Sequence, residues 1–246
     1  PLVEVLPYLV IVIALGTLLL SLPIASRYGR MRVIDAMFTA TSATCVTGLV
    51  VRDTWTQFTV FGQAVILVLI QVGGLGLVTL TSFFALAMRR RMGFRDLRVL
   101  GESVSADGYA QAKDVLRIVV GLAALFEGIG ILLLLFAFVP QFGLQGIWIS
   151  IFTAISAFCN AGFDLFGQFG AYSSLVPYVH NYYVQAVVMF MIIAGGLGFM
   201  VWVELIQYPK KRKLSLHARV VLIFSVLLWV GGAALIGLME WNNPAS

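Results

Sequence analysis

Long stretches without any charged side chain alternate with short charged segments along this chain. Five of the uncharged stretches reach or exceed the ~20 residues that a helix needs to cross a hydrocarbon core about 30 Å thick. The stretches are Val5–Ser26, Thr54–Met88, Gly128–Phe163, Leu165–Val203 and Val220–Met239. This pattern predicts several membrane-spanning helices, so we expect an all-α membrane protein.

One uncharged stretch, Ala36–Val51, does not fit a membrane span. It is shorter than the others and rich in Thr and Ser, so exposing it to lipid would be costly. Non-helical backbone at membrane depth is tolerated only where it is buried in protein or lines a water-filled cavity. We therefore expect a re-entrant hairpin, with a short helix over about 33–44 and an extended return over 45–49.

A copy of this hairpin sequence occurs 114 positions later. Phe38–Leu49 reads FTATSATCVTGL and Phe152–Phe163 reads FTAISAFCNAGF, with identical residues at seven of twelve positions. Each copy is followed by an apolar stretch that contains the tetrapeptide Gly-Gly-Leu-Gly, at 73–76 and at 195–198. The repeat therefore covers a whole unit of outer helix (M1), pore helix, pore loop and inner helix (M2), an arrangement like that of potassium channels.

The expected fold is two complete M1–pore loop–M2 repeats and the first helix of a third. The first repeat occupies 1–88, with helices at about 5–25, 33–44 and 58–88. A basic linker over 89–114 leads to the second repeat at 115–208, with helices at about 115–139, 145–157 and 182–206 and a loop at 158–163. Residues 209–246 form a cytoplasmic turn and an outer-type helix at 215–240, and no third pore loop follows in this sequence.

Composition supports membrane insertion, and the charges indicate the topology. The chain is 61% hydrophobic and 11% charged, with a mean hydropathy of +0.99, whereas soluble domains carry about 25% charged residues. Twelve of the 16 Lys and Arg residues lie in 89–117 and 210–219. The positive-inside rule assigns both segments, and with them the N-terminus, to the cytoplasm. The net charge of +5 is thus explained by topology and does not indicate a nucleic-acid-binding face.

The two repeated loops carry the residue types of a carbonyl-lined cation filter. Rings of backbone carbonyls can replace the hydration shell of an alkali cation, and glycine supplies the positive φ that such a loop needs. Gly48 and Gly162 hold the same place in the two copies, and no carboxylate lies within either loop. The candidate ion-binding residues are Val46, Thr47, Gly48 and Leu49 in one loop and Asn160, Ala161, Gly162 and Phe163 in the other.

Three acidic residues are candidates for a role beside the filter. Asp53 and Asp164 follow the loops closely and could concentrate cations at the pore mouth. The alternative is a helix cap or a salt bridge, for Asp53 with Arg52 or another arginine. Glu127 lies inside an apolar stretch, where an ionisable residue is a functional hypothesis by default, although it could equally pair with a neighbouring group.

Three other features have a plain interpretation beside a functional one. We expect Cys45 and Cys159 to be small pore-loop residues and not a disulfide or metal pair. The Gly-Gly-Leu-Gly tetrapeptides favour close helix packing, or a weakened inner helix beside the ion path. Met88–Arg98 reads as an amphipathic helix on anionic lipid, and the wider segment Arg89–Asp114 could also dock a cytoplasmic partner.

The segments Thr41–Leu49 and Ser156–Phe163, with the Gly-Gly-Leu-Gly stretches that follow, resemble the Trk/Ktr/HKT superfamily of potassium transporters, most of all the KtrB-type membrane subunit. The resemblance implies four repeats around one K⁺ filter, with Gly48 and Gly162 as two of its four glycines. It also implies a multi-pass protein of the bacterial inner membrane that forms a homodimer. The expected partner is a cytoplasmic nucleotide-binding RCK-type ring (KtrA-like), with Na⁺ as a coupling or activating ion and no organic cofactor.

Two loops alone cannot surround a cation, so two completions stay open. The chain is the N-terminal half of a longer protein, or two copies pair to complete the filter. Competing functions are a two-loop water or solute pore, which lacks support because neither loop contains Asn-Pro-Ala, and a non-conducting regulatory membrane subunit. An enzyme is not expected, because no nucleophilic, phosphate-binding or metal-ligand constellation appears.

Overall fold

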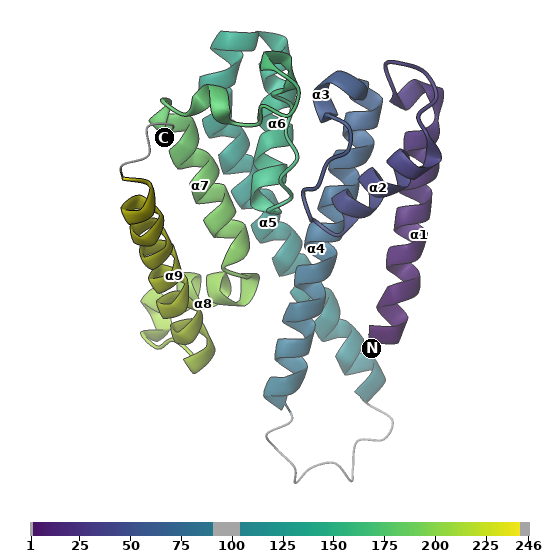
Figure 1. Cartoon of the computed structure of the whole chain (residues 1–246). Helices are drawn as coiled ribbons and strands as arrows, with labels where there is room; N and C mark the ends of the chain where they lie inside the picture. The colour runs from purple at the N-terminus through teal and green to yellow at the C-terminus, as the bar shows by residue number, and fades with distance from the viewer. Residues whose placement is uncertain (1, 91–103, 242–246) are drawn as a thin grey trace. The chain divides into compact units, whose positions relative to one another are not determined.

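The computed structural model describes residues 2–90 and 104–241, and these residues form helices without any strand (Figure 1). The chain divides into two compact units, Pro1–Gly196 and Leu197–Ser246. The first unit contains α1 (Leu2–Ser21), α2 (Val33–Thr44), α3 (Thr54–Gln57), α4 (Val60–Arg90), α5 (Val104–Phe142), α6 (Leu144–Phe158) and α7 (Tyr182–Gly196), with short 3₁₀ turns η1 (Pro23–Ala25), η2 (Gly167–Phe169) and η3 (Val176–Tyr178). The second unit contains α8 (Phe199–Lys211) and α9 (Leu216–Glu240).

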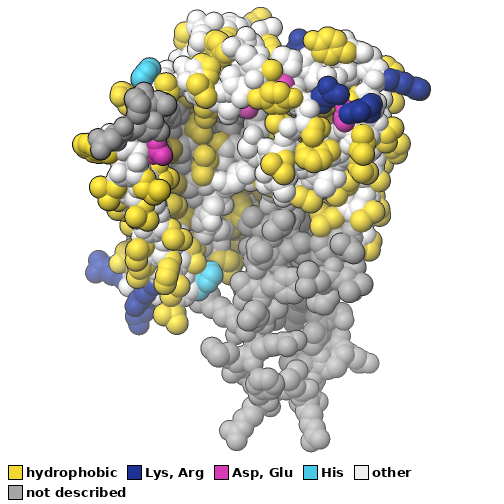
Figure 2. All heavy atoms as spheres, viewed as in Figure 1, with side chains coloured by type: hydrophobic (Ala, Val, Ile, Leu, Met, Phe, Trp, Pro, Cys, Tyr) yellow, Lys and Arg dark blue, Asp and Glu magenta, His cyan; other side chains and the backbone are white. Residues whose placement is uncertain are grey.

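Several helices have the length and composition of membrane spans. Among the described residues, Arg117–Phe142 within α5 and the whole of α9 are long and apolar enough to cross a membrane, and α7 with α8 counts as a third if the two form one broken span. Large apolar side chains such as Leu18, Val68 and Phe136 lie on the outside of the helices, and Figure 2 shows hydrophobic side chains spread over the face in view. These features confirm the expected all-helical fold with membrane-protein character.

Within the first unit, α2 and α6 each pack between two other helices. The helix α2 contacts α1 and α4, and α6 contacts α5 and α7. Figure 1 shows these two groups beside each other, and α4 joins them through contacts with α5 and α6. Large buried side chains, among them Phe58, Ile66, Phe138 and Phe152, fill the space between the helices.

Both boundaries of α5 differ from those expected from the sequence. The helix α5 begins at Val104, inside the expected linker 89–114, and continues through Pro140 to Phe142. Proline interrupts a helix by removing one donor and crowding the carbonyl four residues earlier, but so near the end it costs little, and Gly143 at φ 59° makes the turn instead. Most of the expected amphipathic helix Met88–Arg98 lies outside the described residues.

The prediction of one continuous inner helix over 182–206 is wrong, because the helix is interrupted at Leu197 and Gly198. Gly198 has φ 82°, a conformation that ends α7 and precedes α8. In the first copy of the tetrapeptide, α4 instead continues through Gly73–Gly76 without a break. The weakened inner helix that the tetrapeptide suggested is therefore present in one copy only.

The second unit consists of α8 and α9, which contact each other. Ser215 begins α9 by accepting a hydrogen bond from the Ala218 N–H, and its own N–H donates to the Glu204 carboxylate at 2.8 Å. Such side-chain caps stabilise helix ends by satisfying backbone donors. Glu204 thus serves the turn between the two helices.

Candidate functional site

The segments that follow α2 and α6 have the same backbone conformation. Val46 and Gly48 have φ values of 56° and 74°, and the equivalent Asn160 and Gly162 have 57° and 73°. A β-branched residue such as Val46 rarely adopts positive φ. Such strain of about 1–3 kcal/mol persists only where the surrounding structure imposes it, as it does at many ligand sites.

The hydrogen bonds that end the two short helices also correspond one to one. The Thr47 N–H donates to the Ser42 carbonyl and the Val46 N–H to the Ala43 carbonyl, which is the Schellman arrangement. The same pair of bonds recurs from Ala161 to Ser156 and from Asn160 to Ala157. Glycine usually occupies the left-handed position of this motif, so the presence of Val46 and Asn160 there is specific to these loops.

The two loops contact each other at their glycines. A Cβ atom on Gly48 would lie 2.8 Å from the Ala161 carbonyl oxygen and 3.3 Å from the Gly162 Cα. A Cβ atom on Gly162 would lie 3.2 Å from the Gly48 Cα. Both positions therefore require glycine for backbone conformation and for space. Of the other candidate ion-binding residues, Ala161 and Phe163 are buried, Leu49 is exposed, and Thr47 donates through its hydroxyl to the Ser42 hydroxyl.

The first glycine of each tetrapeptide packs against the last carbonyl group of a short helix. A Cβ atom on Gly73 would overlap the Thr44 carbonyl oxygen, and one on Gly195 would overlap the Phe158 carbonyl oxygen. Gly74 contacts the second copy instead, where a Cβ atom would lie 2.8 Å from the Cys159 Sγ. The tetrapeptides therefore allow close packing, as one of the two interpretations predicted. The helix α4 approaches the carboxyl end of α2, and α7 approaches the carboxyl end of α6.

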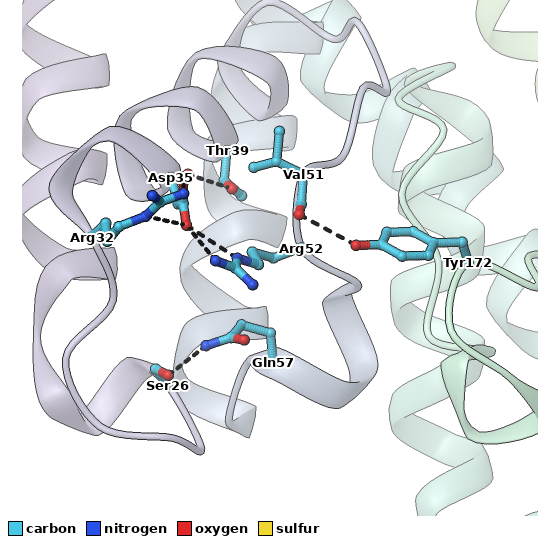
Figure 3. A network of polar contacts seen from close by, with 8 residues as sticks. All are labelled: Ser26, Arg32, Asp35, Thr39, Val51, Arg52, Gln57 and Tyr172. Carbon is cyan, nitrogen blue, oxygen red and sulfur yellow. Dashed lines mark hydrogen bonds and ion pairs between the residues drawn. The ribbon is translucent and has the colours of Figure 1, made fainter.

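The acidic residues near the loops have defined partners. Asp53 caps α3 by accepting from the Thr56 N–H at 2.8 Å, and its second oxygen accepts from the Tyr172 N–H at 3.0 Å. Arg52 pairs with Asp35 and not with Asp53, at 2.9 Å (Figure 3). The arginines Arg32 and Arg52 hold the pKa of Asp35 below its ordinary value through hydrogen bonds and charge.

Asp164, the second residue expected at the mouth, is half-buried. Its carboxylate accepts from the Phe166 N–H at 2.9 Å. Burial raises the pKa of Asp164, and the charge of Asp53 adds to this, while the Phe166 hydrogen bond opposes it. The two candidate mouth residues are thus electrostatically coupled, and Asp53 is committed to capping.

Glu127 is buried within α5, and its carboxylate accepts from the Gln71 side-chain amide of α4 at 2.9 and 3.1 Å. The Cys159 Sγ lies 3.9 Å from Oε1 of the Gln71 side-chain amide. Cys45 and Cys159 are free thiols, and the described residues contain no group of three or more His, Cys, Asp or Glu side chains that could hold a metal ion. Sequence reasoning missed Gln71 and Tyr172, because contacts across 56 and 119 positions leave no local signal.

Comparison with known proteins finds relatives of one family over nearly the whole chain. Residues 7–238 match the TrkH family model, described as a cation transport protein. The chain is 40% identical to the potassium/sodium uptake protein NtpJ of Enterococcus hirae, over 95% of this chain and 51% of that protein. It is 36% identical to the Ktr system potassium uptake protein B of Bacillus subtilis, over 95% of this chain and 52% of the relative.

A third relative, the Ktr system potassium uptake protein B of Vibrio alginolyticus, is 34% identical over 97% of this chain and 53% of that protein. The chain therefore spans about half the length of the curated relatives it matches. The family model and these identities together show that the chain belongs to the TrkH family of cation transport proteins.

Proposed function

We propose that this chain forms half of the ion pathway of a bacterial potassium uptake protein of the Ktr/Trk type. The observation that carries the proposal is the pair of equivalent loops whose glycines, Gly48 and Gly162, lie so close together that a Cβ atom on either would come within 3.3 Å of the Cα atom of the other. Their backbones have matching φ values, and repeated backbone carbonyls are what an alkali-cation filter uses. The names of the relatives indicate potassium, and for NtpJ also sodium, as the transported ions.

In this proposal the ion-binding groups are the backbone carbonyls of the two loops. The residues that contribute them are Val46, Thr47, Gly48 and Leu49, with Asn160, Ala161, Gly162 and Phe163. The carboxyl ends of α2 and α6 precede the loops, and the partial negative charge at a helix C-terminus favours a cation nearby. Asp164 is the better candidate for attracting cations to the mouth, because Asp53 is engaged as a cap.

The proposed architecture is two M1–pore loop–M2 repeats. The helices α1, α2 and α4 serve the repeat over 1–88, and α5, α6 and α7 with α8 serve the repeat over 115–208. The helix α9 is the outer helix of a third repeat. The matched packing of α2 and α6, each between two other helices of its repeat, supports this assignment.

Two further loops are needed to enclose the ion, from the rest of a longer protein or from a second copy. The surface at the second tetrapeptide is a place where a third loop could pack. Gly74 packs against Cys159 of the following repeat, whereas its equivalent Gly196 is exposed. Among the described residues, the atom nearest to a Cβ placed on Gly196 would be Asn160 Nδ2, at 3.9 Å. The roughly twofold length of the relatives favours the longer protein.

The remaining assignments follow from the family. We propose a protein of the bacterial inner membrane with a cytoplasmic N-terminus, which forms a homodimer and binds a cytoplasmic nucleotide-sensing RCK-type ring. K⁺ is the transported ion, Na⁺ acts as a coupling or activating ion, and no organic cofactor or nucleic acid takes part.

The test is rubidium uptake by potassium-auxotrophic bacteria that express the intact gene. Gly48→Ser and Gly162→Ser should lower the preference for rubidium over sodium, because each places a side chain at positive φ against the opposite loop. Gly76→Ser is the control, since no atom of the described residues lies within 4 Å of its Cβ position. Unchanged rates and unchanged sodium discrimination in both loop variants would remove the filter assignment.

A further inference from the structure

Three consecutive residues directly after the first loop are each held by a separate contact. We refer to Val51, Arg52 and Asp53 as the outer strap, and Figure 3 shows Val51 and Arg52 with their partners. Val51 is three positions beyond Gly48, so the strap fixes the end of the loop opposite to the one that α2 holds. The contacts come from two different repeats.

The first contact ties the strap to its own short helix. Arg52 donates through Nε and Nη2 to Asp35 Oδ2 at 3.1 and 2.9 Å, and Asp35 lies in the first turn of α2. The other oxygen, Oδ1, accepts from Arg32 at 3.1 Å. Asp35 is 7% exposed, and charge-assisted hydrogen bonds of this kind are shorter and stronger than neutral ones. The two ends of the segment that contains α2 and the loop are thereby joined.

The second contact ties the strap to the other repeat. The Tyr172 hydroxyl donates to the Val51 carbonyl at 3.3 Å, and the Tyr172 N–H donates to Asp53 Oδ2 at 3.0 Å. Tyr172 has φ 64°, an unfavourable conformation for a residue with a side chain. Gly167 lies against the same carboxylate, since a Cβ atom there would be 2.6 Å from the Asp53 Cγ.

We propose that the outer strap sets the cation selectivity of the first loop, with Asp35 and Tyr172 as positioning residues; this rests on the proposed function of the loops. Discrimination between cations depends on where the carbonyl oxygens lie and how freely they move. A functional constellation has to be held within about 0.5 Å by the contacts around it. The strap supplies such contacts from both sides, and the close approach of Gly48 to Gly162 leaves no room for the loop to relax.

The experiment measures rubidium and sodium uptake by the full-length protein in potassium-auxotrophic cells, with membrane protein levels from immunoblots. Tyr172→Phe removes only the bond to Val51, and Arg52→Gln removes the ion pair with Asp35. The matched control for the tyrosine is Tyr183→Phe, whose hydroxyl donates to the Leu133 carbonyl within α5 at 2.8 Å. The control for the arginine is Arg32→Gln, which leaves the Arg52 pair in place.

We expect each strap variant to lower the rubidium-to-sodium uptake ratio about two- to tenfold, the effect of losing one hydrogen bond, while both controls keep the native ratio. Arg52→Lys should restore part of it. An unchanged ratio in Tyr172→Phe and Arg52→Gln at native protein level overturns the inference. If Arg52→Gln does not accumulate, Tyr172→Phe alone decides. Gly48→Ser distinguishes the role of the strap from the role of the filter. If Gly48→Ser lowers the rubidium-to-sodium ratio and the strap variants do not, only the role of the strap is wrong. If Gly48→Ser also has no effect, the filter assignment itself is wrong.

Discussion

Replacement of Gly73 by alanine tests whether α4 positions the end of α2. A Cβ atom on Gly73 would lie 2.7 Å from the Thr44 carbonyl carbon and would overlap its oxygen, whereas real Cβ contacts stay above 3.0 Å. The obstacle is backbone, which cannot rotate away as a flexible side chain would. Relief therefore requires α4 to move away from α2, or the Thr44 carbonyl to move toward the loop.

The expected cost follows from two opposing effects. Overpacking a buried contact typically costs about 1–3 kcal/mol, and rigid backbone places this substitution in the upper part of that range. Alanine is favoured over glycine inside a helix by roughly 1 kcal/mol. The net result is a destabilisation of about 1–2 kcal/mol for Gly73→Ala, by combining these two ranges. Gly76 lies in the same tetrapeptide, and within the part of the chain that the structure describes no atom lies within 4 Å of its Cβ position. For Gly76→Ala only the favourable effect therefore remains.

The assay is thermal unfolding of the purified full-length protein in detergent, followed by rubidium uptake in cells. A change of 1 kcal/mol moves the midpoint by about 2–4 °C in a chain of this size class. Gly73→Ala should melt several degrees below the native protein and transport more slowly, and Gly76→Ala should melt at or above it. If Gly73→Ala and Gly76→Ala behaved alike, the contact between α4 and Thr44 would not matter and the reasoning would fail.

Four further predictions use the same measurements. Gly195→Ala should destabilise through the Phe158 carbonyl, and Gly196→Ala should not. Glu127→Gln should retain a hydrogen bond with Gln71, whereas Glu127→Leu leaves that amide without its acceptor and costs about 1–3 kcal/mol; equal melting of the two would contradict this. Because the pKa of Asp164 is raised, its charge opposes folding at neutral pH, so Asp164→Asn should raise the midpoint at pH 7 and less so at lower pH. The pKa of Asp35 is lowered from 3.8, so its stabilisation is complete above that value and Asp35→Asn should cost as much at pH 5 as at pH 7.

The sequence predicted the short helices well, because local and repeated signals agree there. The expected range 33–44 is the range of α2, and α6 differs from the expected 145–157 by one residue at each end. The first segment is short and rich in Thr and Ser, which distinguishes it from a lipid-facing span. The second segment is as apolar as the spans, and only its similarity to the first copy identified it as a short pore helix. The positive φ at Gly48 and Gly162 was likewise expected from the residue type.

Identical local sequence could not predict the different outcomes of the two tetrapeptides. Gly76 stays helical within α4, whereas Gly198 has φ 82° and separates α7 from α8. A glycine permits both conformations at similar cost, so contacts distant in sequence decide between them. The same limit applies to Tyr172 and Asp53, whose hydrogen bond joins two repeats.

The arginines that flank the first loop show how contacts change the meaning of a charge count. Four of them lie on the side that the positive-inside rule assigns away from the cytoplasm, where they would repel an approaching cation. Arg32 and Arg52 share the Asp35 carboxylate, and Arg27 lies 5.3 Å from the centre of the Trp55 ring and donates to the Phe58 carbonyl at 3.1 Å. Arg27 and Arg52 thus join segments that are distant along the chain, whereas Arg32 forms a local ion pair at the start of α2. Their presence is explained by the structure they stabilise, and the Asp35 charge offsets part of the repulsion that they would otherwise exert on a cation.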